Sequence, residues 1–395
     1  MGSDRKILPS DLHKIPNLQI PEVDLEKEFD LLQEVGEGWY AKVFLVEHRR
    51  TRSEIVLKAL HKDYISKQDV TREFHYSYNL GTLNAAKVLV RTFDILFISN
   101  DCYVFAQEYA PFGDMTSNVS DIGIGEIYTK RVAKQIASAI DFLHDHHLVH
   151  RDIKLDNVLV FRSDFSKVKL SDFGECRKKG TLLVRFNEWV PYCPPEIVNT
   201  PQDTSYSVEF HQDTWQFAVM VYLCLTGNIP WQKADARSDP RYQAFDMWQR
   251  SRVMKTPKGF KIFSNKARRL FRKMLDLNPA KRSVHLSDEM QKYSEDKWLT
   301  KVPEKPIDED ELSTNMSMLS FHSSLTDKNR LLFTLTRYGV ETTVDRDMKK
   351  DRIKEWIASS TIEEEENEEE EEWDIGSDHA ASSHNSNQST SQQSR

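Results

Sequence analysis

The stretch His150-Arg151-Asp152-Ile153-Lys154-Leu155-Asp156-Asn157 is followed by Asp172-Phe173-Gly174, which begins fifteen residues after Asn157. A three-letter match recurs by chance in many proteins, so neither stretch alone indicates a function. Here short apolar runs flank them and read as two strands of a hairpin, residues 159–160 and 168–170. The ordered set of carboxylates, amide and lysine predicts a site for phosphate and magnesium, and hence transfer of a phosphoryl group.

A glycine-rich stretch lies upstream, between two apolar alternating runs at residues 29–35 and 43–46. It reads Gly36-Glu37-Gly38-Trp39-Tyr40-Ala41-Lys42-Val43, which predicts a strand, a tight turn and a second strand. Glycines let backbone N–H groups meet phosphate oxygens without a Cβ in the way, so Gly36, Glu37 and Gly38 are candidate nucleotide contacts. The alternative is a plain turn joining two strands, since such turns are common.

Lys58 ends the apolar run Ile55-Val56-Leu57-Lys58, which predicts a buried strand. A lysine in that place normally faces solvent. Paired with the glycine turn, it can instead reach the phosphates of a nucleotide if a glutamate on a helix holds it. Residues 67–80 read as a helix, and Glu73 is its only glutamate. We therefore expect Glu73 to pair with Lys58, against the alternative of a solvated helix position.

These residues resemble the eukaryotic protein kinase family over roughly residues 29–300. Further matching motifs are Pro194-Pro195-Glu196, Asp213-Thr214-Trp215-Gln216-Phe217 and Arg282. Within the family the chain looks most like the SH3-binding-domain kinases, a small serine/threonine group. The resemblance implies an α+β fold with two lobes: a small, mainly-β N-terminal lobe (25–108) and a larger, mainly-α C-terminal lobe (110–300).

The resemblance also implies chemical roles. Asp152 is expected to be the catalytic base for the substrate hydroxyl, while Lys154 neutralises charge near the γ-phosphate and favours serine or threonine substrates. Asn157 and Asp172 are expected to bind magnesium, because hard cations prefer oxygen ligands. With Lys58 and Glu73 holding the nucleotide, the implied cofactors are ATP and Mg²⁺.

The nucleotide pocket is outlined by the run Tyr103-Val104-Phe105-Ala106-Gln107-Glu108-Tyr109-Ala110, which reads as a strand entering a linker. The family pattern puts Gln107 at the gatekeeper position and the backbone of Glu108 and Ala110 against the adenine. Asp114 is expected near the ribose or a basic substrate residue. Val43 and Val56 would sandwich the base, with Leu159 below it. For the apolar residues, ordinary strand core is nearly as good an interpretation.

Two positions in the segment after Asp172 bear on substrate choice and regulation. Trp189 stands where serine/threonine kinases usually place a threonine, which keeps a tyrosine or dual-specificity kinase open as an alternative. Thr181 lies near several basic residues, and we expect a phosphate there to pair with Arg151 and order the segment. A pseudokinase or scaffold is a further alternative, although none of the catalytic motif residues is substituted. A small-molecule kinase is disfavoured by the Pro194-Pro195-Glu196 segment.

Composition limits the remaining possibilities. Four scattered cysteines with no C-x-x-C pair indicate a reducing compartment, so a cytoplasmic location, or a nuclear one, is expected. The longest apolar run, residues 217–225, is too short to cross a bilayer and fits a buried central helix ended by Gly227. We expect protein substrates, regulatory or SH3-type partners, no nucleic acid, no membrane and a monomer.

The two ends of the chain differ from its centre. Residues 1–24 are expected to be an extended lead-in, and residues 301–360 a polar C-terminal extension with a short helix at 352–358. Residues 361–395 are an acidic and then Ser/Asn/Gln-rich tail, which is expected to be disordered. Residues 361–375 carry a formal charge of −10, and without them the net charge of −8 becomes +2. This segment is either a solvated tail or a segment that weakly lowers activity through electrostatic attraction to basic residues.

Overall fold

The structure is a computed structural model, and it describes residues 12–37, 41–82, 87–185, 191–201, 203–251 and 254–301. The predicted C-terminal extension beyond residue 301 and the tail lie outside the described residues, as do Gly38 and Trp189. None of the helices in the described ranges is long and apolar enough to pass through a lipid bilayer.

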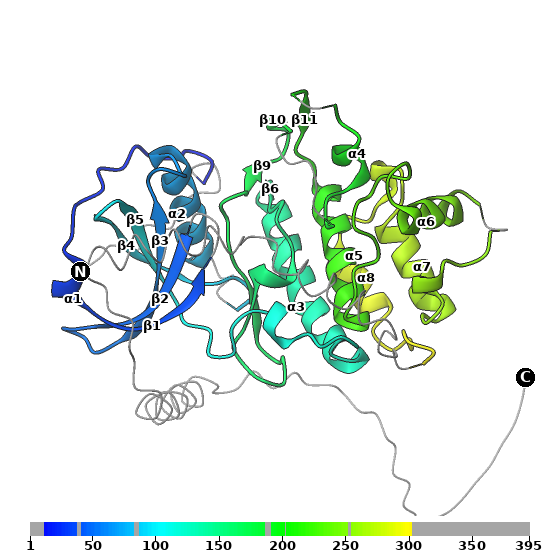
Figure 1. Cartoon of the computed structure of the whole chain (residues 1–395), viewed down its shortest axis with the longest axis horizontal. Coiled ribbons are helices and arrows are strands. Elements are labelled where there is room, and N and C mark those ends of the chain that lie inside the picture. Colours follow the sequence, from blue (N-terminus) through cyan, green and yellow to red (C-terminus); the bar gives the residue numbers. More distant parts are fainter. Residues whose placement is uncertain are drawn as a thin grey trace, which may run out of the picture. The chain divides into compact units, whose positions relative to one another are not determined.

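The N-terminal part is an antiparallel five-stranded sheet with strand order β1-β2-β3-β5-β4 (Figure 1). Its strands are β1 (Phe29–Glu37), β2 (Ala41–His48), β3 (Glu54–His61), β4 (Thr92–Ser99) and β5 (Cys102–Gln107). A short helix, α1 (Leu25–Glu28), precedes the sheet, and α2 (Lys67–Thr82) lies alongside β4 and β5. The two predicted strands and the predicted helix at 67–80 are therefore confirmed, while the predicted turn at residues 38–40 lies outside the described residues.

The register of the sheet explains how three predicted nucleotide contacts meet. Val43 of β2 pairs with Lys58 of β3, and Val56 lies two residues before Lys58 on the same strand. Side chains two residues apart on a strand, and side chains paired across strands, share one face of a sheet. Val43, Val56 and Lys58 therefore project from one face.

The second part is mainly helical. Its longer helices are α3 (Glu126–Asp145), α5 (Phe210–Thr226), α6 (Pro240–Arg250), α7 (Asn265–Met274) and α8 (Leu286–Lys292), and α4 (Pro195–Val198) is a single turn. Three strand pairs lie among them: β6 (Leu148–Val149) with β9 (Arg177–Lys178), β7 (Val158–Val160) with β8 (Val168–Leu170), and β10 (Leu182–Val184) with β11 (Ser205–Ser207). Single 3-10 turns are at Thr116–Asn118, Leu155–Asn157, Lys258–Phe260 and Pro279–Lys281. This division matches the predicted α+β architecture, with a small mainly-β lobe before a larger helical lobe.

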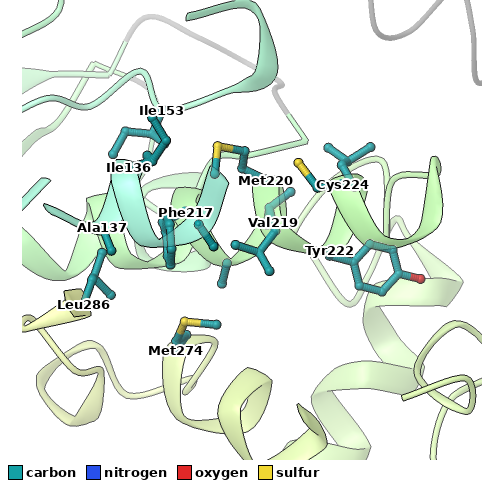
Figure 2. Close-up of a cluster of buried hydrophobic side chains, with 14 of the residues drawn as sticks. Ile136, Ala137, Ile153, Phe217, Val219, Met220, Tyr222, Cys224, Met274 and Leu286 are labelled. Carbon is teal, nitrogen blue, oxygen red and sulfur yellow. The ribbon is translucent and has the colours of Figure 1, made fainter. Parts of the chain in front are cut away.

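Helix α5 is the centre of the helical core. Every residue from Gln212 to Thr226 is buried, and Figure 2 shows Phe217 and Met220 of this helix among side chains of α3 and α8. An apolar stripe on α3, from Val132 to Leu143, faces the same core. Gly227 ends α5 with φ of 69°, and a Cβ there would lie 2.3 Å from the Ser120 carbonyl oxygen. The chain therefore requires glycine at this end of the helix.

Candidate active site

Lys58 lies between two carboxylates that come from different parts of the chain. Its Nζ is 2.7 Å from Glu73 Oε1 on α2 and 3.1 Å from Asp172 Oδ1, which follows β8. The Lys58 and Glu73 side chains are only 8% and 1% exposed, whereas Asp172 is 28% exposed. The predicted pairing of Lys58 with Glu73 is therefore present in the structure, and it draws Asp172 toward the same point.

The electrostatics of the three groups differ. Burial opposes ionisation of Asp172, but the charges of Lys58 and Lys154 outweigh it and lower the pKa of Asp172 to about 2. Burial raises the pKa of Glu73, and the attraction of Lys58 works against that rise. Asp172 is thus an anion at neutral pH. An ionised, partly exposed carboxylate is the kind of ligand that a divalent cation prefers.

Backbone geometry around Asp172 is tightly set. Asp172 adopts a left-handed conformation with φ of 63°, which is costly for a residue other than glycine. The Gly174 N–H donates to Asp172 Oδ1 at 3.3 Å. A Cβ on Gly174 would lie 3.3 Å from both Asp172 Oδ1 and Glu73 Oε2. The glycine therefore lets α2 approach closely enough for Glu73 to reach Lys58.

The loop of residues 150–157, which we call the catalytic loop after its expected role, holds Asp152 with two donors. Lys154 Nζ is 2.9 Å from Asp152 Oδ2, and Asn157 Nδ2 donates to the same oxygen at 2.8 Å. Burial lowers the pKa of Lys154, but the attraction of Asp152 outweighs this effect and raises it overall. Because Asn157 uses its amide nitrogen on Asp152, its Oδ1 is the amide atom suited to a cation. Asp152 Oδ1 is the carboxylate atom suited to a substrate hydroxyl.

Two residues that we did not assign a role from sequence, Asp213 and Gln216 at the start of α5, anchor this loop. Asp213 accepts hydrogen bonds from the backbone N–H groups of His150 and Arg151, each at 2.8 Å. It also accepts one from His144 Nε2 at 2.9 Å. Gln216 accepts from the Ile153 N–H at 3.0 Å and donates to the Arg151 carbonyl at 2.7 Å. The sequence signal that could have identified them is a pair of polar residues, three positions apart, at the start of a very apolar helix. Residues three apart lie on the same face of a helix.

His150 connects the catalytic loop with the Asp-Phe-Gly segment. Its Nε2 donates to the Ser171 carbonyl at 3.0 Å, and its ring packs edge-on against Phe173 with centroids 5.4 Å apart. His150 is fully buried. The segments that carry Asp152 and Asp172 are therefore joined by buried contacts of His150.

The structure describes most of the residues that are expected to line the nucleotide pocket. Val56 and Ala110 are buried, Val43 and Leu159 are half-buried, and Leu159 of β7 bridges to Asp114. Asp114 Oδ1 accepts from the Ser117 N–H at 2.7 Å, and Gln107 Nε2 donates to Thr92 Oγ1 at 3.1 Å. Gly36 pairs with Val43 in the register of β1 and β2. The side chain of Glu37 and all of Gly38 lie outside what the structure describes.

Glu108 has a side-chain role that we did not predict. Its carboxylate receives Lys169 Nζ of β8 at 2.7 Å and 3.0 Å and the Arg91 N–H at 2.6 Å. In the described part of the chain, the Glu108 carbonyl and the Ala110 N–H make no backbone hydrogen bond. The linker is thus fixed to β8 through the side chain, and its backbone groups suit an adenine edge.

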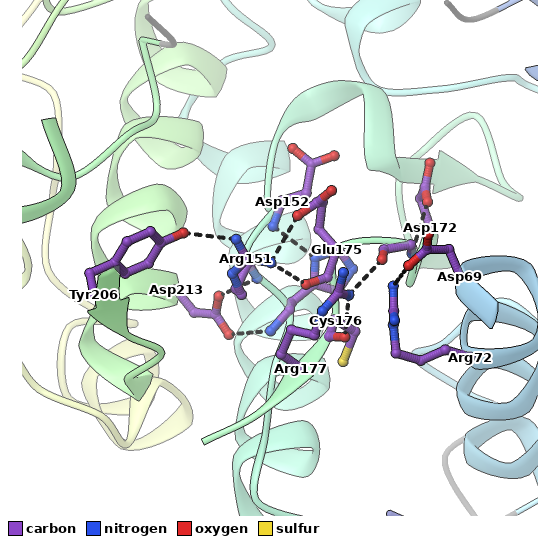
Figure 3. A network of polar contacts seen from close by, with 12 residues as sticks. Asp69, Arg72, Arg151, Asp152, Asp172, Glu175, Cys176, Arg177, Tyr206 and Asp213 are labelled. Carbon is purple, nitrogen blue, oxygen red and sulfur yellow. Dashed lines mark hydrogen bonds and ion pairs between the residues drawn. The ribbon is translucent and has the colours of Figure 1, made fainter. Parts of the chain in front are cut away.

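The segment after Asp172 is held by an ion pair and by hydrogen bonds. Figure 3 shows the guanidinium of Arg151 between Glu175 and Tyr206; its Nη1 is 2.8 Å from Glu175 Oε2 and its Nη2 donates to Tyr206 Oη at 2.8 Å. Thr181 Oγ1 donates to the Lys178 carbonyl at 2.7 Å. The expected pairing of a phosphate on Thr181 with Arg151 stays a prediction, and Arg151 already has a carboxylate partner.

The motif residues Glu196 and Arg282 form a forked ion pair. Arg282 Nη1 is 2.6 Å from Glu196 Oε1, and Arg282 Nη2 is 2.8 Å from Glu196 Oε2. The guanidinium also lies over the Trp215 ring, 4.7 Å from its centroid. This pair ties α4 to the residue that follows the 3-10 turn Pro279–Lys281.

Comparisons with known proteins agree with this geometry. Residues 29–299 match the family described as "Protein kinase domain". The serine/threonine-protein kinase meng-po of Drosophila melanogaster is 33% identical over 364 residues, which cover 88% of this chain and 78% of the relative. The serine/threonine-protein kinase SBK1 of Mus musculus is 34% identical, covering 71% of this chain and 67% of its own length. SBK1 of Danio rerio is 37% identical, covering 69% of each chain.

Proposed function

Since the chain belongs to the protein kinase family and is a serine/threonine-protein kinase, we propose that it uses ATP and magnesium with Asp152 as its catalytic base. The observation that carries the proposal is the convergence of Lys58, Asp172, Asp152 and Asn157 from distant parts of the chain. In phosphoryl transfer, positioning and electrostatic stabilisation supply most of the catalysis.

Asp172 and Asn157 would hold magnesium through oxygen atoms. The donor set fits the ion, because Asp172 is ionised and the Asn157 amide nitrogen is already engaged with Asp152. Bound magnesium neutralises charge on the nucleotide phosphates. Lys58, with its ammonium held by Glu73, would bind the phosphates beside it. Gly36, Glu37 and Gly38 would supply backbone N–H groups.

Asp152 would receive the proton of the substrate hydroxyl at Oδ1 while Lys154 and Asn157 hold its Oδ2. As the hydroxyl oxygen forms its bond to the γ-phosphorus, the bond to the ADP oxygen breaks and Lys154 balances the charge near the phosphate. Val43, Val56 and Leu159 would enclose the adenine, with the Glu108 carbonyl and the Ala110 N–H at its edge and Asp114 near the ribose.

We also propose protein serine or threonine side chains as the acceptors and a reducing compartment, cytoplasmic or nuclear, as the location. None of the four cysteines, Cys102, Cys176, Cys193 and Cys224, forms a disulfide, which supports a reducing compartment. The chain would act as a monomer.

The test is transfer of label from γ-labelled ATP to a mixture of protein substrates, with and without a magnesium chelator, followed by identification of the labelled residue type. Asp152→Asn should lower kcat by about 10²–10⁴-fold with little change in the KM for ATP. Asp164→Asn, on an exposed loop, is the matched control and should leave kcat unchanged. Wild-type rates in Asp152→Asn, or transfer that survives the chelator, would refute the proposal.

A further inference from the structure

Residues 12–23, which we call the N-terminal strap, carry no regular helix or sheet strand, yet they make specific contacts with the small lobe. Leu12 is only 1% exposed. The backbone of the strap is fixed to β4, which is an edge strand of the sheet: Ile98 N donates to the Pro21 carbonyl and Val23 N donates to the Ile98 carbonyl, each at 2.8 Å. The strap is therefore anchored at one end independently of α2.

The other end of the strap is hydrogen-bonded to α2. His75 Nε2 donates to the Leu12 carbonyl at 2.9 Å, and the other ring nitrogen, Nδ1, accepts from Asn79 Nδ2 at 3.0 Å. Asn79 Nδ2 also donates to the His75 carbonyl at 2.6 Å. Both ring nitrogens of the buried His75 are thus used, and the neutral imidazole couples the strap to two turns of the helix.

Apolar contacts reinforce this connection along the same helix. Leu12 belongs to the buried cluster that contains Tyr76 and Leu80 of α2 and the core of the helical lobe. Leu18 packs against a second cluster, which contains Val70 and Phe74 of α2. The strap therefore contributes to the same two apolar clusters as residues of α2 that precede and follow Glu73.

Glu73 needs such support. Its carboxylate is almost fully buried, and burial raises its pKa, so its environment disfavours the ionised form that Lys58 requires. Only a helix held in place keeps Glu73 Oε1 at 2.7 Å from Lys58 Nζ. A small movement of α2 would separate the two groups and release Lys58.

We propose that the N-terminal strap positions α2 for catalysis, with Leu12 and His75 as positioning residues that act through the ion pair of Glu73 and Lys58. The chain thereby carries its own support for this helix. The inference rests on the proposed function, because the ion pair matters only if Lys58 binds nucleotide phosphates.

The experiment is a double-mutant cycle on the full chain, with kcat and the KM for ATP measured separately. Leu12→Ala should lower kcat/KM for ATP about fivefold or more in the wild-type background, and by less than about twofold in a Glu73→Gln background. His75→Phe, which keeps a ring of similar size but removes both hydrogen bonds, should behave in the same way. Leu25→Ala, in α1 and outside the strap, truncates a side chain that packs on the sheet cluster and should have little effect in either background.

Leu12→Met keeps a large apolar side chain at residue 12 and should retain most of the activity that Leu12→Ala loses. This variant separates a positioning effect from a loss of folding. If Leu12→Ala does not fold, the cycle with His75→Phe decides. Equal losses in both backgrounds, or no loss in the wild-type background, would overturn the inference. An inactive wild-type chain would instead refute the proposed function, so the two failures are distinguishable.

Discussion

Gly174 and Asp172 determine how closely the two lobes meet at Lys58. Lys58 and Glu73 could be paired from sequence because a buried strand lysine and the only glutamate of a nearby helix have complementary charges. The roles of Asp213 and of the Glu108 carboxylate could not be predicted in this way. Their partners lie about 60 residues away in sequence, and only the folded packing brings them together.

Gly174→Ala should lower kcat about tenfold, because the added Cβ would press on carboxylate oxygens of Asp172 and Glu73 at 3.3 Å and shift them by tenths of an ångström. Steady-state kinetics with ATP as the varied substrate measures this effect. Gly81→Ala, near the end of α2, would meet only ordinary contacts of 3.6 Å and serves as the control. Equal rates for the two variants would contradict the steric argument.

At the scale of elements, the apolar runs predicted four strands of the sheet, β1, β2, β3 and β5, whereas β4 was not predicted. The small pairs β6 with β9 and β10 with β11 were not predicted, because strands of two or three residues leave no periodic signal. The equally short β7 and β8 could be predicted only from the motifs beside them. The burial of Leu12 was also missed, because a single leucine in a proline-containing lead-in gives no pattern.

The contact of α2 with the N-terminal strap should depend on pH. Burial lowers the pKa of His75 below its ordinary 6.5, although the hydrogen bond to Leu12 opposes this shift. The unfolded chain therefore binds the proton more readily than the folded one, so stability is full above pH 6.5 and falls as the pH drops below it.

Chemical unfolding at about pH 7.5 and about pH 5.5 should show a larger loss of stability in wild type than in His75→Phe, by up to about 1.4 kcal/mol per pH unit. The pKa of His13 is also lowered, mainly by burial. His13 is present in both proteins, so its contribution to the pH dependence of stability does not change the comparison. Identical losses in the two proteins would show that His75 does not titrate across this range.

The ion pair between α4 and the end of the helical core gives a second prediction for elements. Arg282→Met should lower the free energy of unfolding by about 2–4 kcal/mol, because it leaves the Glu196 carboxylate without its forked partner in a mostly buried place. Arg250→Met, which breaks an exposed pair with Asp246, should cost less than about 1 kcal/mol. Urea unfolding of both variants checks this, and equal costs would contradict it.

At the scale of the whole molecule, charge is unevenly distributed along the chain. The acidic residues between 361 and 375 account for more than the whole net charge of −8. The sequence alone identifies this charge asymmetry. It does not identify the substrate, because substrate choice depends on the shape of the surface around the site rather than on local sequence patterns.

Deletion of residues 361–395 should raise activity more at low than at high ionic strength if the tail competes electrostatically for basic residues of the kinase domain. The comparison is made at ionic strengths of about 0.01 M and 0.15 M, where the screening length is about 30 Å and 8 Å. A chain in which all nine glutamates of residues 363–372 are replaced by glutamine keeps the length and is the control; it should match the deletion. An equal effect of deletion at both ionic strengths would exclude the electrostatic account.

The central claim is that Lys58, Asp152, Asn157 and Asp172 surround one magnesium-bound nucleotide, and calorimetric titration with ATP tests it most directly. We predict that magnesium tightens ATP binding to the wild-type chain by about tenfold or more, and that Asp172→Asn loses this gain while still binding ATP through Lys58. Lys58→Met should weaken binding whether or not magnesium is present. An equal magnesium effect in wild type and Asp172→Asn, or a folded wild-type chain that does not bind Mg-ATP, would contradict the account.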